Sequence, residues 1–343
     1  MKKIVFFTEH PAPYWDNCFF ELEKNAAVFV IYNKTTVNSK KWNNYIGYKG
    51  KTINLKSIFE TIQKIISADV IIIGGIYLKL HLFMFYLSKI LNKKVFLFSD
   101  LPEIKSRSKL KIILKRYLIY SLFSKILVAS KEGIKLYINV YKIKTGKFIY
   151  FPYAWEKKEK SMLDFIENKS TFNIFISNRF LERKGYNILF EVIDKLNTNG
   201  LLIHFNIEIA GNGPLLNFYK DKYVNLYKNL KFLGWINYQD YLDSMKKCDI
   251  YIHPSLFEPF GIPIIDALNM GKIVISSDGV VAGVDYIKNE VNGFIYNKNK
   301  STELYGILNN IIKSRYNLKL ISTNASNSIP EYSIFIDELN SVI

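Results

Sequence analysis

Short hydrophobic runs alternate with longer amphipathic stretches along most of the chain. Runs rich in Val, Ile and Phe are typical of strands buried on both faces of a parallel sheet, and the stretches between them are typical of the helices that cover it. The pattern predicts strands at 4–7, 28–32, 70–74, 95–99, 126–130 and 148–152 in the first half, and at 172–177, 204–210, 230–234, 249–254 and 272–277 in the second.

The polar stretch 156–170 interrupts this alternation and predicts a linker. With 343 residues the chain is long for one domain and suits two. We therefore expect an α/β protein in which two Rossmann-like doubly wound domains, residues 1–155 and 171–330, face a central cleft. Residues 331–343 predict a C-terminal helix, whose return to the first domain stays open. Ligands of such sheets bind beyond the carboxyl ends of the strands.

Cysteine use and the first residues indicate a cytoplasmic protein. Cys18 and Cys248 are too few for a disulfide framework and suit a reducing compartment. The start, MKKIVFFTEHPAPYWD, holds only a short apolar run without a small-residue cleavage site, so we interpret it as a strand rather than a signal peptide. No apolar stretch is long enough to predict a membrane-spanning helix.

The excess of positive charge lies entirely in the first half of the chain. Residues 1–150 hold 26 Lys and Arg against 9 Asp and Glu, a net charge of +17, whereas residues 151–343 hold 21 of each kind. Compositional bias would act on both halves equally. The asymmetry therefore indicates that the first domain meets an anionic partner.

The stretch 105–116, KSRSKLKIILKR, concentrates this charge, with six cations and no acid. Leu110, Ile113 and Leu114 within it and Tyr117 directly after it recur with helical spacing. A basic amphipathic helix is typical of a segment that lies on an anionic membrane surface, which we expect here. The alternative is a helix whose apolar stripe packs on the sheet while its lysines are solvated.

Two glycine patterns argue against a nicotinamide enzyme. The first strand is followed by TEHPAPYWD, which lacks the G-x-G-x-x-G that brings backbone close to a pyrophosphate. The loop AGNGP at 210–214 follows a strand and opens a helix, but has only two glycines, Gly211 and Gly213. A tight strand-to-helix turn is the alternative interpretation of this loop.

The stretch SLFEPFGIPIIDALNMG at 255–271 predicts a binding site. It places a turn with Glu258 and Gly261 between a buried strand and a helix that begins near Ile262. Free N–H groups at such a helix start favour phosphate, while Glu258 suits sugar hydroxyls and Asp266 suits the vicinal hydroxyls of a ribose. A ligand with hydroxyls, phosphates and a ribose is a nucleotide sugar.

The spacing from Glu258 to Asp266 resembles the Glu-x7-Glu signature of retaining glycosyltransferases with the two-Rossmann-domain (GT-B) fold, in particular family 4 (glycosyl transferases group 1). Asp266 is one methylene shorter than the usual second acid. SNRFLERKGYNILFEVIDKL at 177–196 resembles the family's Gly-Arg-Leu…Lys-Gly segment, with Asn178 where glycine is usual and the separation of Arg179 and Lys184 kept. AGNGP, FLGWI and 282–296 also fall in the family's order.

The resemblance implies retaining, metal-independent transfer of a hexose-type sugar from a nucleotide diphosphate sugar, UDP rather than GDP, to a saccharide acceptor, with no further cofactor. In the family the first acid contacts the sugar and the second the ribose. By resemblance, Arg179, Lys184 and the amides near Gly261 would stabilise the leaving diphosphate. The remaining expected donor contacts are Gly211, Gly213, Trp235, Pro259, Phe260 and Ile262.

The acceptor is expected on the basic domain. The family often has a histidine where this chain has Asp100, and Asp100 and His10 are the candidate acceptor contacts. His253, at a strand end, is interpreted mainly as structural. A lipid-linked glycan of bacterial surface polysaccharide synthesis, used at the inner face of the cell membrane, would explain both charge and apolar surface.

Two alternatives stay open. A basic nucleic-acid-binding or membrane-binding protein without catalysis fits the charge, although no helix-turn-helix, finger or aromatic-basic strand motif is present and no nucleic-acid partner is expected. A nucleotide-sugar epimerase of the same fold is harder to exclude.

Overall fold

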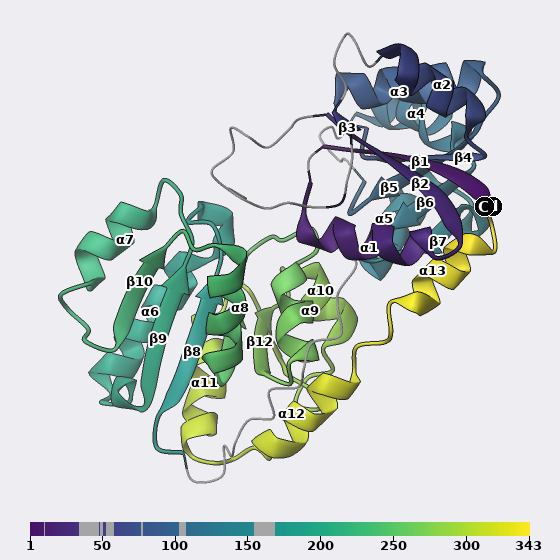
Figure 1. Ribbon diagram of the computed structural model, residues 1–343. Helices are drawn as coiled ribbons and strands as arrows, with labels where there is room; N and C mark the ends of the chain where they lie inside the picture. The colour runs from purple at the N-terminus through teal and green to yellow at the C-terminus, as the bar shows by residue number, and fades with distance from the viewer. Residues whose placement is uncertain are drawn as a thin grey trace. The chain divides into compact units, whose positions relative to one another are not determined.

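The computed structural model describes residues 1–9, 11–33, 48, 51–52, 58–76, 78–102, 108–153 and 169–343 (Figure 1). The chain divides into two compact units: unit 1 is Met1–Glu156 with Glu331–Ile343, and unit 2 is Lys157–Pro330. The expected linker falls largely outside the described residues.

Unit 1 is built on a parallel seven-stranded sheet of order β3-β2-β1-β4-β5-β6-β7. The order runs outward in both directions from β1 and β4, as in doubly wound sheets. The strands are β1 (Lys2–Thr8), β2 (Ala26–Tyr32), β3 (Lys51–Thr52), β4 (Val70–Gly74), β5 (Lys94–Ser99), β6 (Lys125–Val128) and β7 (Phe148–Tyr150). The helices are α1 (Pro13–Glu23), α2 (Ile58–Ser67), α3 (Lys79–Ile90), α4 (Lys109–Leu118), α5 (Lys131–Tyr141) and α13 (Ser333–Asn340).

Local chemistry fixes the ends of several of these helices. Helix α1 begins with Pro13, whose missing N–H is not needed in the first turn. Helix α5 is capped by Ser130, whose hydroxyl accepts a hydrogen bond from the Gly133 N–H at 2.9 Å. It ends at Lys142, which adopts a left-handed conformation.

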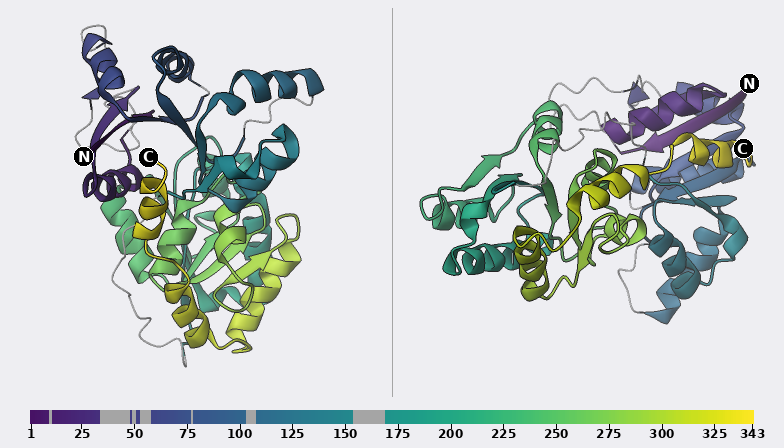
Figure 2. Two further views of the ribbon diagram at one scale, coloured as in Figure 1. Left: turned by 90° about the vertical axis from the view of Figure 1, so that its right-hand side faces the viewer. Right: turned by 90° about the horizontal axis from the view of Figure 1, so that it is seen from below.

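The last helix of the chain packs in unit 1. Helix α13 packs against α1 and β7. Both views of Figure 2 show this last helix, in yellow, beside α1, in purple. The Tyr332 hydroxyl donates to the Pro152 carbonyl at 3.1 Å, and Phe335 meets the ring of Tyr150 edge-on. Residues far apart in the chain thus close one core.

Unit 2 is built on a parallel six-stranded sheet of order β10-β9-β8-β11-β12-β13. Its strands are β8 (Phe172–Ser177), β9 (Phe205–Ala210), β10 (Leu230–Gly234), β11 (Ile250–His253), β12 (Ile273–Ser277) and β13 (Phe294–Tyr296). Its helices are α6 (Tyr186–Thr198), α7 (Leu216–Tyr223), α8 (Tyr238–Lys247), α9 (Ile262–Asn269), α10 (Val281–Tyr286), α11 (Ser301–Ile312) and α12 (Leu318–Asn327).

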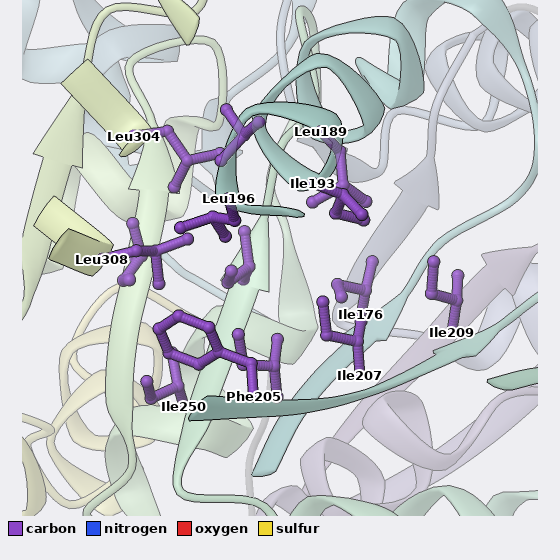
Figure 3. Packing of buried hydrophobic residues seen from close by; sticks show 14 of the residues in the cluster. Ile176, Leu189, Ile193, Leu196, Phe205, Ile207, Ile209, Ile250, Leu304 and Leu308 are labelled. Atoms are coloured by element: carbon purple, nitrogen blue, oxygen red, sulfur yellow. The ribbon is translucent and has the colours of Figure 1, made fainter. Parts of the chain in front are cut away.

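Alternation along the strands of unit 2 separates its two cores. Ile176 and Ile207 point toward Ile193 of α6, in the buried cluster that also holds Leu304 of α11 (Figure 3). Phe175 points to the opposite face and contacts the ring of Tyr241 on α8. Because both faces are covered, the strands carry nearly continuous hydrophobic runs.

The expected α/β class with two doubly wound sheets is confirmed. All eleven predicted strands are present, each within about two residues of its expected ends. The short strands β3 and β13 were not predicted. Among the described residues, none of the helices combines the length and the apolar character that crossing a bilayer requires.

Replacing Leu196 by alanine tests the core of unit 2. Leu196 is fully buried, so Leu196→Ala should lower the free energy of unfolding by about 2–5 kcal/mol through lost burial and a cavity. Urea unfolding followed by circular dichroism measures it. The matched control is Leu226→Ala, at a side chain 58% exposed, which should change stability little. Equal effects of the two changes would contradict this packing.

Candidate functional site

The strand order of unit 2 reverses between β8 and β11. From β8 the chain adds β9 and β10 on one side, and β11, β12 and β13 then follow on the other. Adjacent loops leave the carboxyl ends of β8 and β11 at this switch point, where doubly wound sheets bind their ligands. The predicted residues Arg179, Lys184 and Glu258 all lie on these two loops.

A close backbone approach joins the two loops. The loop after β8 forms a 3-10 turn over Glu182–Lys184 and ends at Gly185, which has a φ of +69°. A Cβ at Gly185 would overlap the carbonyl oxygen of Pro254 in the loop after β11. Glycine is therefore required for this approach, which carries Lys184 to the second loop.

The loop after β11 is held by a third segment, 279–282. The Glu258 N–H donates to the Gly279 carbonyl at 2.9 Å, and the Ala282 N–H donates to the Phe260 carbonyl at 2.8 Å. Gly261 then caps the N-terminus of α9. The turn is thus a fixed structure that sets the direction of the Glu258 side chain.

Lys184 and Glu258 form an ion pair at the meeting of these loops. The side chain of Lys184 is 7% exposed and that of Glu258 18% exposed. Burial, and then the positive charges of Arg183 and Arg179, lower the pKa of Lys184 to about 7. The adjoining Glu258 carboxylate favours the charged ammonium of Lys184. The site therefore holds a buried cation paired with an acid.

The two arginines of this loop have different surroundings. The Arg183 guanidinium donates to the Phe257 carbonyl at 3.0 Å, and the Arg183 carbonyl accepts from the Leu256 N–H at 2.9 Å. The hydrogen bonds of Arg183 therefore connect the loop after β8 to the loop after β11. Arg179 is exposed, close enough to Lys184 to lower the pKa of that lysine.

His253 is the residue of this site that the sequence analysis undervalued. It is buried at the end of β11, and its Nε2 lies 3.7 Å from the Glu258 Oε2. Burial and the charge of Lys184 hold its pKa well below the usual range, so the ring is neutral. Its position in the sequence, at the end of a strand and five residues before Glu258, could have predicted that His253 belongs to the site.

A hydrogen bond assigns the tautomer of His253. The Tyr251 hydroxyl lies 2.9 Å from the His253 Nδ1. The other ring nitrogen, Nε2, faces the Glu258 carboxylate at 3.7 Å, so the neutral ring is more stable with its proton on Nε2. The single proton of Tyr251 is then donated to Nδ1, which leaves Nε2 as an N–H donor directed toward Glu258.

Three buried polar atoms near the switch point have no hydrogen-bond partner among the described residues. They are the Nδ2 of Asn178, the Nε2 of His253 and the Oγ of Ser255. Buried polar groups are normally paired, and each one left unpaired costs about 1–3 kcal/mol. Unmet donors of this kind, next to a cation, suit an oxygen-rich anionic ligand.

Asp266 lies on α9 and is hydrogen-bonded to Tyr241 on α8. Its Oδ2 accepts a hydrogen bond from the Tyr241 hydroxyl at 2.8 Å, and its side chain is buried. Burial and the charge of Asp266 raise the pKa of Tyr241 well above its usual range. The ribose contact expected of Asp266 stays a prediction.

The remaining donor-site candidates lie around the same edge of the sheet. A Cβ at Gly211 would overlap the carbonyl oxygen of Asn178, and one at Gly213 would lie 2.5 Å from that of Phe180. The AGNGP loop therefore supports the segment that carries Arg179. Trp235 is exposed after β10, Pro259 and Ile262 are half-buried, and Phe260 is buried.

The acceptor candidates belong to unit 1. Asp100 follows β5, and its Oδ1 accepts from the Tyr153 hydroxyl at 2.5 Å. Burial raises the pKa of Asp100 to about 6. Tyr153 meets Tyr14 edge-on at 4.7 Å, which adds an aromatic surface beside the acid. His10 lies outside the described residues.

Within the described ranges, His, Cys, Asp and Glu form no group of three that could hold a metal ion.

Comparison with known proteins gives relatives that match part of the chain. A segment of 134 residues is 31% identical to the UDP-Gal:alpha-D-GlcNAc-diphosphoundecaprenol alpha-1,3-galactosyltransferase of Escherichia coli, covering 38% of this chain and 34% of that protein. A segment of 113 residues is 32% identical to the phosphatidylinositol N-acetylglucosaminyltransferase gpi3 subunit of Schizosaccharomyces pombe, covering 32% and 24%. The chain thus matches about a quarter to a third of these relatives' lengths.

The whole chain also shares its fold with a solved structure. The Anabaena Alr3699/HepE protein in complex with UDP-glucose superposes with a TM-score of 0.73, at 17% identity, over 100% of both chains. The expected GT-B fold is thereby confirmed. The model of the family described as Glycosyl transferases group 1 matches residues 157–328, half of the chain. The resemblance noted in the sequence is confirmed, and the chain belongs to the glycosyl transferases group 1 family.

Proposed function

We propose that the protein transfers a hexose-type sugar from a nucleotide diphosphate sugar, with UDP as the preferred nucleotide, to a saccharide acceptor. The observation that carries this proposal is the buried Lys184–Glu258 pair at the switch point of unit 2, beside buried polar atoms that find no partner in the described part of the chain. Family membership supports it, as does a fold shared with a protein solved with UDP-glucose.

The residues of unit 2 would divide the work by charge. Breaking the bond between the sugar C1 and the phosphate oxygen leaves negative charge on the diphosphate, which Lys184 and Arg179 would stabilise. Glu258 would accept hydrogen bonds from sugar hydroxyls. The Nε2–H of His253 would donate to the same ligand and satisfy an atom that is otherwise unpaired.

We propose that the anomeric configuration is retained. The acceptor hydroxyl would attack C1 on the face that the diphosphate leaves, and its proton would pass to the leaving phosphate oxygen. One C–O bond breaks and one forms, so no side chain need act as a nucleophile. The charge of the diphosphate would be met by side chains of the protein, without a metal ion.

The proposed acceptor is a lipid-linked glycan in bacterial surface polysaccharide synthesis, used at the inner face of the cell membrane. The Escherichia coli relative is named for a diphosphoundecaprenol-linked acceptor, which supports the proposal. Asp100 and His10 are the proposed acceptor contacts of unit 1. Asp100 has a pKa of about 6, and its carboxylate accepts a hydrogen bond from the Tyr153 hydroxyl.

A thermal-shift screen of nucleotides tests the donor. A ligand that binds only the folded protein stabilises it by mass action, by about 2.7 kcal/mol at one hundred times its dissociation constant. We expect UDP-hexoses and UDP to raise the melting temperature more than the GDP series. If no nucleotide diphosphate or nucleotide sugar shifts the midpoint, the proposed function is wrong.

Removing the buried cation tests its role. Lys184→Met should lower the rate of transfer from the donor found in the screen by about 10²–10³-fold, because a preorganised charge on the leaving group is lost. The matched control is Lys231→Met, which breaks the exposed Lys231–Glu208 pair of the same unit and should leave the rate unchanged. Similar rates for the two variants would contradict the assignment.

The pKa of Lys184 predicts how donor binding depends on pH. Lys184 is charged below its pKa of about 7 and neutral above it. A nucleotide sugar does not titrate in this range, so its affinity should fall above pH 7, by at most about tenfold per pH unit. Titration calorimetry from pH 6 to 9 measures this, and Lys184→Met should flatten the profile. An affinity that rises with pH would contradict the prediction.

A further inference from the structure

Helix α4 carries an apolar stripe that no described residue of unit 1 buries. None of its residues is buried. Leu110, Ile113, Leu114, Tyr117 and Leu118 follow the i, i+3, i+4, i+7, i+8 pattern of one helix face and are 46–65% exposed. The stripe therefore does not pack on the sheet, which was the alternative that the sequence left open.

Helix α3 continues this exposed apolar surface. The Tyr86 hydroxyl donates to the Leu118 carbonyl at 3.0 Å and so ties α3 to the end of α4, and Figure 1 shows both helices on the same side of unit 1. Phe83, Tyr86 and Ile90 recur along α3 and are 60%, 39% and 81% exposed. Scattered exposed side chains are normal, but a contiguous apolar surface marks an interaction site.

Helix α4 is also strongly basic. Lys109, Lys111, Lys115 and Arg116 stand among the ten residues of α4, and no acid occurs in residues 108–122. The guanidinium of Arg116 lies 5.0 Å from the centre of the Tyr117 ring. Cations thus flank the apolar stripe along its length.

This combination favours an anionic bilayer over a protein as the occupant. The cores of protein interfaces are depleted of lysine, whereas long basic side chains beside an apolar stripe reach the headgroups while the stripe enters the acyl boundary. At ten residues the helix is about 15 Å long, a length that suits lying in the interface plane.

We propose that α4, with the adjoining exposed side chains of α3, is the surface by which the protein docks on anionic lipid. Leu110, Ile113, Leu114 and Tyr117 enter the headgroup boundary, and the four cations of α4 contact lipid phosphates. The inference deepens the proposed function, since a lipid-linked acceptor is presented at such a surface, but the docking itself rests only on α3 and α4.

Vesicle sedimentation with the full chain tests the docking. The protein should bind vesicles of phosphatidylcholine with phosphatidylglycerol, bind phosphatidylcholine alone at least tenfold more weakly, and lose affinity as NaCl is raised, by about fivefold for each cation screened. Binding that ignores both lipid charge and salt overturns the proposal, as does the absence of binding.

A matched pair of variants locates the surface. Ile113→Asp puts a charge into the stripe and should weaken vesicle binding more than tenfold. Ile334→Asp is the control, because Ile334 is an equally exposed isoleucine on a helix of unit 1, 56% against 51%, and should bind as the parent chain does. Equal vesicle binding by the two variants overturns the proposal. Gel filtration gives a second test: if Ile113→Asp alone dissociates a dimer, α4 joins two copies of the chain and the proposal is wrong.

The two proposals fail separately. Ile113→Asp should keep the thermal shift given by the nucleotide sugar, which also shows that the variant is folded. A protein that binds vesicles through α4 but shows no nucleotide shift overturns the glycosyl-transfer proposal alone. One that binds the nucleotide but not the vesicles overturns the docking alone.

Discussion

The site depends on one constraint, the contact of Gly185 with the carbonyl of Pro254. It brings the loops after β8 and β11 together and buries the Lys184–Glu258 pair between them. Taking two charges out of water is costly, and their attraction repays the cost only when the geometry is fixed. The backbone bonds from residues 279–282 and the Arg183 side chain supply that fixed geometry, so much of the surrounding sequence serves to hold two side chains in place.

The same edge of the sheet combines fixed charge with unsatisfied polarity. Asn178, His253 and Ser255 each bury a polar atom that has no partner among the residues the structure describes, and His253 is held neutral by burial and by the nearby lysine. Such a site loses stability in the free protein and regains it when a ligand fills the missing hydrogen bonds. A diphosphate with sugar hydroxyls offers oxygens for those donors and negative charge for the cation.

Unit 1 combines a polar site at the edge of its sheet with an exposed basic and apolar surface. Its core is completed partly by α13 from the other end of the chain. Helix α4 contacts the core through Ile112, while its apolar stripe stays exposed. Asp100 and Tyr153 are hydrogen-bonded to each other at the end of β5 and after β7. Unit 1 therefore offers both a small polar site at a sheet edge and a large basic, apolar surface.

The sequence by itself determined the two parallel sheets and most strand positions, because hydrophobic runs of strand length depend only on local spacing and on burial of both faces. It also determined the family, through Arg179, Lys184, Glu258 and their spacings. Only the tertiary structure decided what depends on contacts between distant segments. It paired Lys184 with Glu258, placed His253 beside them, bound Asp266 to Tyr241 and left α4 uncovered. Amphipathic spacing predicts an apolar helix face but not what packs on that face. An acid before a helix predicts a ligand site but not the side chain that pairs with the acid.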